Sequence, residues 1–316
     1  LATERGIITS AYTTLRPIDT SNSKYLYYLL HAFDLKKGFY GMGSGVRQGL
    51  NYAEVKELRV VLPGQDEQNA IVRFLDNQCG QIDSIIEEAK SSIEEYKKWR
   101  ASIIFEAVTK GLNPLAEMKD SHIDWIGLVP SHWKLSRIKN ELDNLDYLRE
   151  PISAEKRENI LGLYDYYGAS GVIDKIDDYN VDDKVLLIGE DGANLRMRNL
   201  PLVYKAEGKF WVNNHAHILK VHDDNCYGFI AYLLEAGDYS VFITGSAQPK
   251  LSQFNLMRFP IVIPPLVEQQ EIEAYLDEKC SAIDALIREK KSLLSELEIY
   301  KRSLILETVT GKRKVV

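Results

Sequence analysis

The chain has 316 residues, of which 45% are hydrophobic, and its formal net charge is −7. This length predicts two domains or more with packed cores, and no apolar run is long enough to span a bilayer. The acidic charge disfavours a free-standing nucleic-acid-binding protein, although a DNA reader could obtain part of its phosphate contacts from partner subunits.

The chain contains three cysteines, Cys79, Cys226 and Cys280, which are too few and too scattered for a disulfide framework or a zinc cluster. Free cysteines of this kind usually behave as small buried side chains. No secretory signal pattern is recognisable either. We therefore expect a protein of the reducing cytoplasm that has no membrane association.

An ungapped internal repeat relates residues 58–109 to residues 259–310, at a constant offset of 201 positions. Matched identities include Pro63 and Pro264, Glu67-Gln68 and Glu268-Gln269, Ile71 and Ile272, Leu75-Asp76 and Leu276-Asp277, Cys79 and Cys280, Ile82-Asp83 and Ile283-Asp284, Ser102 and Ser303, and Glu106 and Glu307. A repeat of this length predicts two copies of one structural module. Two similar modules would present two similar surfaces, which suits a target with two similar halves.

The first copy begins inside the module, because Ile7–Ser10 matches Trp211–Asn214. Leu1 would then correspond to a position near Lys205, and the counterpart of about 118–204 would be missing. We therefore expect the chain to be a fragment, or the ordered part of a longer one.

Residues 1–64 repeat the order of elements at the end of the second copy. We expect a short helix over 25–30, a second helix with Asn51 as its N-cap, and a strand over Val60–Leu62.

The spacing of apolar residues predicts a long helix in each of the ranges 65–111 and 265–316, because apolar residues recur every three or four positions between charged ones. In the first helix these are Leu75, Cys79, Ile82, Ile86, Ala89, Ile93, Tyr96, Ile103 and Ala107, and in the second Ile272, Leu276, Ile283, Ile287, Leu294, Leu297 and Leu304. Proline precedes each helix, and Gly111 and Gly311 follow them. Each helix would be about 45 residues and roughly 65–70 Å long.

Helices of this length cannot bury their apolar stripe against a compact domain, so packing on each other as a coiled coil is the economical solution. Because a whole domain connects them, their length leaves parallel and antiparallel packing equally open. A simple dimerisation rod is the alternative to a spacer between two modules.

Residues 112–264 read as a mixed α/β or mostly β domain. Strands are expected at Val185–Ile188, Phe210–Val212, His217–Val221 and Phe259–Ile263, a short helix at Tyr227–Leu234, and a further helix capped by Ser252.

The search for catalytic chemistry gives weak signals. His215 and His217 would share one face of a strand, but no third ligand follows at metal spacing. Asp183 and Glu190-Asp191 bracket a strand as nuclease carboxylates can, yet the lysine expected two residues after the acid is missing. Neither a phosphate-binding glycine-lysine loop nor an Asn-Pro-Pro-aromatic stretch is present, so the sequence gives no positive reason to expect an enzyme.

Side chains suited to recognition gather in loops of the second module. Arg196 and Arg198 lie in a polar loop, and Asn213–His215 and Gln248–Lys250 lie in or beside turns. Arginine, asparagine and glutamine form paired hydrogen bonds with base edges, and the backbone of Gly245-Ser246 can approach a phosphate. Each residue alone could be a solvated loop residue.

The first module carries related residues. Gly43-Ser44 is the counterpart of Gly245-Ser246, and Arg47-Gln48 follows it. Recurrence at equivalent places of two modules favours recognition over chance.

At this point the chain resembles the specificity subunit of type I restriction-modification systems. Four motifs carry the resemblance: Asp124–Trp133 as the module-opening motif, Tyr167–Ile173 as the first-strand turn, Thr244–Leu251 as the late loop, and Pro264-Pro265 with Glu268–Gln270 as the entry to the spacer helix. The resemblance covers 118–313 well and 6–111 as a partial copy. The chain departs from the pattern in the missing start of the first module and in Arg47–Gly49, which replaces Gln-Pro-Lys.

The resemblance implies an α+β fold with two mixed α/β target recognition domains, joined by two long helices packed as an antiparallel coiled coil. Residues 1–64 would be the end of the first domain, 65–111 the first spacer helix, 112–264 the second domain, and 265–316 the second helix and the C-terminal tail. Each domain would read one half of a bipartite site in double-stranded DNA.

The implied subunit is not an enzyme and holds no metal and no cofactor of its own. It docks two methyltransferase subunits that use S-adenosylmethionine and, in the full complex, two restriction and translocation subunits that use ATP and Mg²⁺. The expected DNA contacts are Tyr167, Ser170, Arg196, Arg198, Asn213, Asn214, His215, Ser246, Gln248 and Lys250, together with Ser44, Arg47 and Gln48 of the first module. A single-chain nuclease or methyltransferase and a coiled-coil adaptor without DNA contacts are the alternatives.

Overall fold

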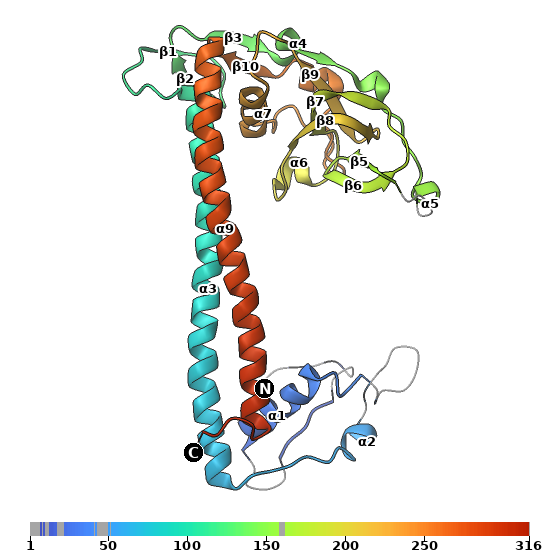
Figure 1. Cartoon of the computed structure of the whole chain (residues 1–316), viewed down its shortest axis with the longest axis vertical. Helices are drawn as coiled ribbons and strands as arrows, with labels where there is room; N and C mark the ends of the chain where they lie inside the picture. Colours follow the sequence, from blue (N-terminus) through green and yellow to red (C-terminus); the bar gives the residue numbers. More distant parts are fainter. Residues whose placement is uncertain are drawn as a thin grey trace. The chain divides into compact units, whose positions relative to one another are not determined.

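The computed structural model (Figure 1) describes residues 7, 9, 13–17, 22–40, 42, 50, 52–157 and 162–315, and every structural statement below concerns these residues. The chain forms two compact units. Unit 1 comprises residues 1–96 and 285–316, and unit 2 comprises residues 97–284. Both long helices contribute to both units, so each unit combines part of each helix with a segment outside the helices.

The two long helices are present as expected. Helix α3 spans Gln65–Lys110 and helix α9 spans Leu266–Val309. The first turn of α3 carries Asp66 and Glu67, whose negative charge favours a helix N-terminus. Gly111 and Gly311, which follow the two helices, both have a φ of 73°, the left-handed conformation that glycine adopts most easily after a helix.

Unit 1 is built on α1 (Ser23–Leu35), α2 (Tyr52–Val55), the start of α3 and the end of α9. The oxygen of the Asn22 side chain caps α1 by accepting hydrogen bonds from the backbone of Lys24 and Tyr25. The buried core joins all three longer helices: Tyr25, Tyr28, Ala32, Ile71, Val72, Leu75, Cys79, Ile82, Ile86, Leu304, Ile305 and Val309. Because the start of α3 meets the end of α9, the helices are antiparallel here, and an ion pair between Asp83 and Lys301 joins them.

The expected strand at Val60–Leu62 is wrong. These residues have no strand partner in the described part of unit 1, and Val61 is 84% exposed. Their repeat counterpart in unit 2 is strand β10 (Pro260–Ile263), which pairs antiparallel with β3 (Lys134–Arg137). A strand needs a hydrogen-bonding neighbour, and the described part of unit 1 places none beside Val60–Leu62. Asn51, expected as the cap of α2, lies outside the described residues, as do Ile8 and Ser10 of the repeat match.

Unit 2 contains a six-stranded sheet with the strand order β4-β9-β7-β8-β5-β6. Its strands are β4 (Leu142–Asn144), β5 (Tyr164–Gly168), β6 (Gly171–Ile176), β7 (Val181–Gly189), β8 (Val203–Val212) and β9 (Ala216–Val221). Neighbours are antiparallel except β5 and β8, which run parallel. The strands expected around 185, 210 and 217 are therefore confirmed.

Smaller elements surround this sheet. They are the paired strands β1 (Met118–Asp120) and β2 (Leu128–Pro130), the pair β3 and β10, and the short helices α4 (Ile138–Glu141), η1 (Asp146–Leu148), α5 (Ala154–Arg157), α6 (Asn194–Met197), α7 (Tyr227–Ala236) and α8 (Gln253–Met257). The Ser252 hydroxyl caps α8 by accepting a hydrogen bond from the backbone of Asn255, as the sequence predicted.

Helix α7 joins the sheet domain to the long helices. Its Phe229, Ile230, Leu233 and Leu234 are buried in a core that also holds Phe259 of the α8–β10 connection, Ile104 and Ala107 of α3, and Ile272 and Leu276 of α9. The end of α3 thus meets the start of α9, so the two helices are antiparallel in unit 2 as well. No helix among the described residues combines the length and apolarity that a membrane span requires.

Candidate nucleic-acid interface

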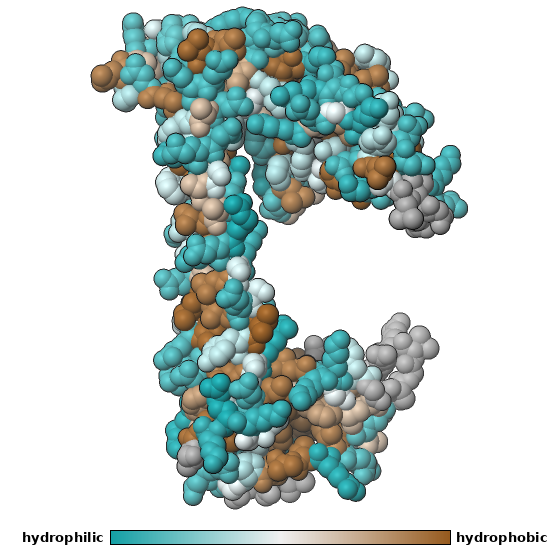
Figure 2. Space-filling view, in the orientation of Figure 1, coloured by the Kyte–Doolittle hydropathy of each residue, from teal (hydrophilic) through white to brown (hydrophobic). Residues whose placement is uncertain are grey.

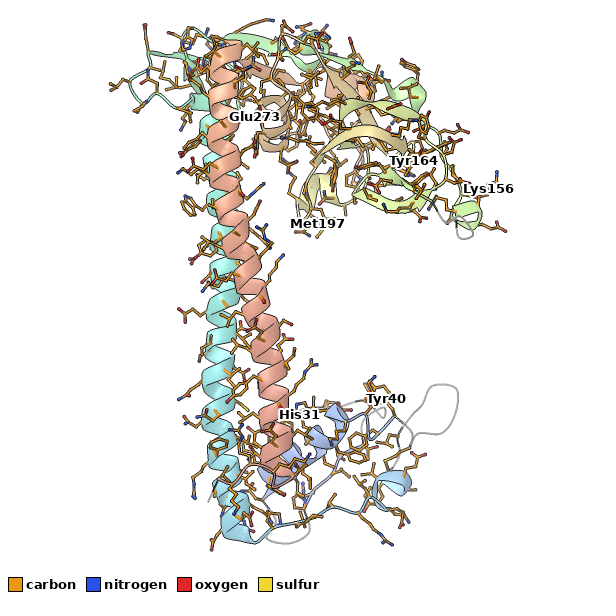
Figure 3. All side chains as sticks on the ribbon, viewed as in Figure 1. His31, Tyr40, Lys156, Tyr164, Met197 and Glu273 are labelled. Carbon is orange, nitrogen blue, oxygen red and sulfur yellow. The ribbon has the colours of Figure 1, made fainter. Side chains whose placement is uncertain are left out.

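Loops of unit 2 that are far apart in sequence converge beside the ends of β7 and β8. Glu190 follows β7 directly; its backbone N–H donates to the carbonyl of His215 (2.8 Å), and its carbonyl accepts from the N–H of Leu251 (2.8 Å). The N–H of Gly192 donates to the carbonyl of Pro249 (3.0 Å). These bonds fix three loops against one another, at 190–193, 213–215 and 244–251, which we call the loop cluster. Figure 3 shows the side chains of this unit, with Met197 at the end of α6.

The turn between β5 and β6 also reaches the loop cluster. A Cβ atom at Gly189 would lie 2.5 Å from the carbonyl oxygen of Ala169, so only glycine allows this approach. The turn carries Ser170, which is exposed.

A buried carboxylate lies at the centre of the loop cluster. Glu190 is 7% exposed and forms ion pairs with Arg149 and with Lys250, whose Nζ lies 3.0 Å from its Oε1. Burial opposes ionisation of Glu190, but the hydrogen bonds from Lys250 and Arg149 outweigh it, so the pKa of Glu190 is lowered. The ionised carboxylate therefore holds the loop after β7 to the loop at 244–251.

A second buried pair supports the first. Asp146 Oδ2 lies 2.6 Å from Nδ1 of His217 and 3.3 Å from Arg149. Burial opposes ionisation of Asp146, yet the hydrogen bond from His217 and its charge keep the pKa of Asp146 low. The other ring nitrogen of His217 lies 2.8 Å from the carbonyl oxygen of Leu251. His217 therefore connects the carboxylate of Asp146 to the loop at 244–251.

The sequence did not single out Arg149 or Asp146. Arg149 lies 41 positions before Glu190, in no recognisable motif, and its role depends on contacts that the fold creates. Glu190 was noticed only as a possible nuclease carboxylate.

Eight of the ten candidates in the second module are exposed, and all of these except Arg198 lie at the loop cluster or at the turns beside it without being anchored to α7. These seven are Ser170, Arg196, Asn214, His215, Ser246, Gln248 and Lys250. Arg196 is held loosely, because its Nη2 donates one hydrogen bond of 3.2 Å to the carbonyl of Gly245. His215 Nδ1 lies 2.8 Å from Asp191. The structure thus brings these polar side chains together in unit 2.

The other three candidates make contacts within the protein. Arg198 has a φ of 52° and donates to the carbonyls of Glu235 and Gly237 at the C-terminal end of α7. Asn213 is buried and accepts a hydrogen bond from the backbone of His215. Tyr167 is half-buried, with its ring 5.5 Å from that of Phe210. Ser44, Arg47 and Gln48 of the first module lie outside the described residues.

The groups considered for catalysis do not form a shared site. Asp183 is paired with Lys220 at 2.6 Å, while Glu190 is paired with Arg149 and Lys250. His217 is fully buried and His215 is exposed, so the two imidazoles bond to different carboxylates. Over the described part of the chain, no three histidine, cysteine or acidic side chains are grouped as a metal ion would require.

Residues 130–296 match the family described as type I restriction modification DNA specificity domain, which is more than half of the chain. The chain belongs to this family. The matched segment contains the loop cluster, both buried ion-pair groups and all ten candidate residues of the second module.

Curated relatives from this DNA specificity family are similar over part of their length. A putative type I restriction enzyme specificity subunit of Haemophilus influenzae is 33% identical over 146 residues, which are 46% of this chain and 36% of that protein. A putative type I restriction enzyme specificity subunit of Methanocaldococcus jannaschii is 30% identical over 119 residues, 37% of this chain and 26% of that protein. The matches therefore span about a third of these relatives.

A solved structure shares the fold of this specificity-family chain. A chain from a structure of a type I restriction-modification system, described for complex assembly and conformational transition, superposes with a TM-score of 0.68. It is 15% identical, and the match covers 90% of this chain and 70% of that one. The α+β fold with paired long helices is thus shared with a component of such a system.

Proposed function

We propose that this chain recognises a DNA sequence as the specificity subunit of a type I restriction-modification complex. The loop cluster of unit 2 would contact one half of a bipartite site in double-stranded DNA. The carrying observation is that exposed polar side chains from separate loops are gathered round one buried, ionised carboxylate, Glu190, within the segment that matches the DNA specificity family.

The exposed side chains divide by chemistry. Arg196, Asn214 and Gln248 can form paired hydrogen bonds with guanine or adenine edges, which carry sequence information. Lys250, Ser246 and Ser170 are suited to phosphate oxygens, which fix orientation without reading sequence. Rigid loops favour such reading, because less side-chain and backbone freedom is lost on binding.

Three residues act as positioning residues in this proposal. Arg198 fixes the end of α6 against α7 and so orients Arg196. Asn213 shapes the turn that carries Asn214 and His215. Tyr167 supports the strand beside that turn, where its carbonyl accepts from the N–H of Asn213.

The first module, with Ser44, Arg47 and Gln48, would contact the other half-site. In this proposal residues 1–64 and 112–264 are the recognition segments, and the helices over 65–111 and 265–316 set the distance between half-sites. The chain itself would catalyse nothing and bind no cofactor.

Partners would supply the chemistry, in the cytoplasm. Two methyltransferase subunits would use S-adenosylmethionine, and two restriction and translocation subunits would use ATP with Mg²⁺. Their basic surfaces would also compensate for the acidic charge of this chain, since DNA affinity depends strongly on neutralised phosphates.

The direct test is a methylation map of DNA from cells that carry the intact system, repeated with Arg196→Ala and Gln248→Ala. Loss of a paired base contact should cost about 1–3 kcal/mol of discrimination and relax the methylated sequence at one position. Arg137→Ala is the matched control, because Arg137 is an exposed arginine of β3 away from the loop cluster. An unchanged methylated sequence in both variants, with the complex intact by native mass spectrometry, would contradict base reading by unit 2.

The spacer role has its own test. Counting inward from the ion pair of Asp83 with Lys301, residues 90–96 of α3 face residues 288–294 of α9. Deleting both segments removes about 10 Å of helix, which should shorten the gap between methylated half-sites by roughly three base pairs. If the gap between the methylated half-sites keeps its length, the helices do not set the distance between the half-sites.

The alternative of a single-chain enzyme is tested with the purified chain. Incubation with DNA, Mg²⁺ and S-adenosylmethionine should give neither strand cleavage nor methyl transfer. Either activity, retained through purification and abolished by Glu190→Gln, would favour the alternative.

A further inference from the structure

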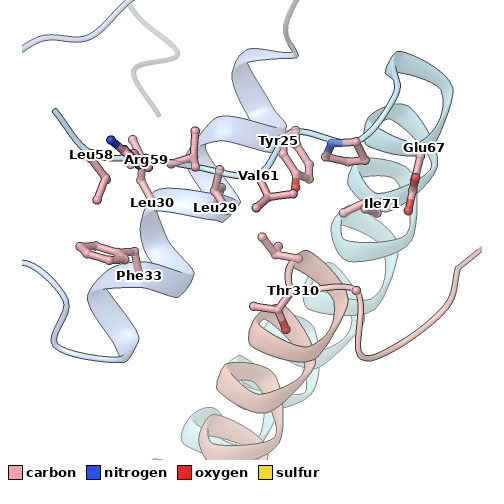
Figure 4. A pocket seen from close by; sticks show the side chains of 14 residues that line it. Tyr25, Leu29, Leu30, Phe33, Leu58, Arg59, Val61, Glu67, Ile71 and Thr310 are labelled. Carbon is pink, nitrogen blue, oxygen red and sulfur yellow. The ribbon is translucent and has the colours of Figure 1, made fainter. Parts of the chain in front are cut away.

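Unit 1 contains an apolar cavity of about 380 Å³ (Figure 4). One wall is α1, with Tyr25, Leu29, Leu30 and Phe33. The other walls are the segment 58–63, the start of α3 at Glu67 and Ile71, and the end of α9 with Gly311. Figure 2 shows apolar residues gathered on the visible face of this unit.

The segment that borders this cavity exposes three consecutive apolar residues. Val60, Val61 and Leu62 are 41%, 84% and 45% exposed. Their repeat counterparts Ile261, Val262 and Ile263 are 0%, 0% and 7% exposed. Free-standing proteins rarely leave contiguous aliphatic residues this open, so the contrast points to an interaction site.

Unit 2 shows what covers the equivalent place. Strand β3 pairs antiparallel with β10, so that Lys134 lies opposite Ile263, Leu135 opposite Val262, and Arg137 opposite Pro260. Trp133, which precedes β3, is 1% exposed and fills the space beside the end of α3.

Two further contacts hold Trp133. Its indole N–H donates to Oε2 of Glu268 (3.1 Å), and a Cβ atom at Gly111 would lie only 3.1 Å from its ring. A tryptophan with a carboxylate acceptor and a glycine-lined wall therefore closes this end of unit 2.

The same acceptor and the same glycine wall are present in unit 1. Glu67 is the repeat counterpart of Glu268, it lines the cavity, and none of the described residues hydrogen-bonds to it. Gly311 follows α9 with the same φ as Gly111, and a Cβ atom added there would meet nothing within 4 Å.

The hydrogen bonds that join the short helix to the long helix are also the same beside the cavity of unit 1 and beside Trp133 of unit 2. The Asn22 N–H donates to Gln68 Oε1 (3.1 Å) as the Cys226 N–H donates to Gln269 Oε1 (2.8 Å). The position of α1 relative to the start of α3 therefore matches the position of α7 relative to the start of α9. The cavity in unit 1 thus corresponds to the space that Trp133 fills in unit 2.

We propose that unit 1 binds a polypeptide segment with the chemistry of Val129–Arg137, namely a tryptophan followed by a short strand with an aliphatic residue. The indole would enter the cavity and donate to Glu67, and the strand would pair antiparallel with Arg59–Leu62. By the register of unit 2, the residue after the tryptophan lies opposite Leu62, and the next lies opposite Val61. The proposal is independent of DNA recognition by unit 2.

The binding test uses the full chain and a fluorescent peptide with the sequence of 129–137. We expect saturable binding that protects the amides of 59–62 from hydrogen exchange. Replacing the tryptophan of the peptide by alanine should weaken binding at least about 10-fold, because buried tryptophans dominate such interfaces. Glu67→Gln should weaken binding less, and Val61→Asp should abolish it.

The control variant is Val241→Asp. Val241 is 85% exposed, as Val61 is, but lies in unit 2, so this variant should bind the peptide normally. Binding that survives Val61→Asp, or an absence of protection at 59–62, would overturn the proposal. Self-association of the chain would also overturn the proposal if Val61→Asp abolishes it and the peptide does not inhibit it. The exposed segment would then bind a second copy of the chain.

Disulfide trapping keeps the test decisive if the free peptide binds weakly. Val61→Cys should form a disulfide with a peptide that carries cysteine in place of Leu135, which lies opposite Val61 in the proposed register. Cysteine in place of Ser136 should trap several-fold less, because alternate residues of a strand point to opposite faces. The three native cysteines are buried, so they should not compete. Equal trapping at both positions would contradict the register.

Discussion

The two units form the same joint between a short helix and a long helix. In unit 1, Gln68 accepts from the N–H of Asn22 and donates to the carbonyl of Pro63. In unit 2, Gln269 accepts from Cys226 and donates to Pro264 in the same way.

A tyrosine completes each joint. The hydroxyl of Tyr28 donates to Asp76 at 2.8 Å, and that of Tyr232 donates to Asp277 at 2.7 Å. Burial and this hydrogen bond raise the pKa of both tyrosines, because ionisation would oppose the carboxylate. The short helix therefore docks on the long helix through equivalent hydrogen bonds in both units, although the rest of the two units differs.

The difference lies in what covers the joint. In unit 2, β3 and Trp133 bury β10, whereas the described part of unit 1 leaves Val60–Leu62 exposed beside a cavity. The comparison teaches that the joint specifies where the short helix docks on the long helix. Whether the segment before the long helix forms a strand depends on a separate partner strand, as β10 depends on β3. Three of the four predictions below test this conclusion, and the variant of Glu190 tests the loop cluster that only unit 2 shows among the described residues.

Trp133→Ala should have the largest effect, about 3–5 kcal/mol of unfolding free energy, because it empties a fully buried site. It should also make β10 resemble 59–62, with fast amide exchange at 260–263. Urea unfolding followed by hydrogen exchange measures both quantities. A loss below about 1 kcal/mol would show that Trp133 does not cover the joint.

Gly111→Ala and Gly311→Ala form a matched pair at the two helix ends. Both place alanine at a φ of 73°, which costs about 1–2 kcal/mol. Gly111→Ala should cost about 2–4 kcal/mol in total, since its Cβ would also crowd Trp133. Thermal and urea unfolding of both variants provide the comparison; equal losses would mean that the two places are filled alike.

Glu190→Gln should cost about 1–3 kcal/mol at neutral pH, because it removes a buried hydrogen-bonded charge. The pKa of Glu190 is lowered in the folded state, so its contribution is present above the ordinary carboxyl pKa and is lost as the pH falls through the folded pKa. The difference in stability between the two proteins should therefore shrink on acidification. Urea unfolding across this pH range measures it.

Asp183→Asn is the control for that experiment. Asp183 pairs with Lys220 near the surface, so its loss should cost less than about 1 kcal/mol. A larger loss than for Glu190→Gln would mean that the loop cluster does not depend on its buried carboxylate.

Apart from the Asp183→Asn control, Tyr28→Phe and Tyr232→Phe should have the smallest effects, about 1 kcal/mol each, since one hydrogen bond is removed and the ring stays. Amide exchange should accelerate in α1 for the first variant and in α7 for the second. If the acceleration of amide exchange differs several-fold between the two variants, the two joints are not equivalent.

Sequence patterns predicted both long helices, the helices α7 and α8, and four strands of unit 2, namely β7, β8, β9 and β10, but not β1 to β6. The periodicity of Leu75, Cys79 and Ile82 is local information, and so is the capping chemistry of Ser252. The strand at Val60–Leu62 was predicted wrongly, because its β propensity is local whereas its partner is not.

The sequence identified several of the polar side chains that the fold exposes together, and their contact with DNA stays a prediction. Arg196, Gln248 and Lys250 were recognised by their side-chain chemistry in loops and are exposed together in unit 2. Arg198 and Asn213 looked equivalent to them in the sequence, but backbone hydrogen bonds engage both within the protein.

The sequence by itself determined the repeat, the two long helices and the kind of side chain that the loops present, because all three depend on residues a few positions apart or on direct self-similarity. The tertiary structure decided which charges meet and which apolar residues are covered. Arg149 reaches Glu190, and Trp133 reaches Glu268, only when segments 41 and 135 residues apart are brought into contact by the fold. Such pairings minimise buried unpaired charge and exposed apolar area in three dimensions, and no local pattern in the chain encodes them.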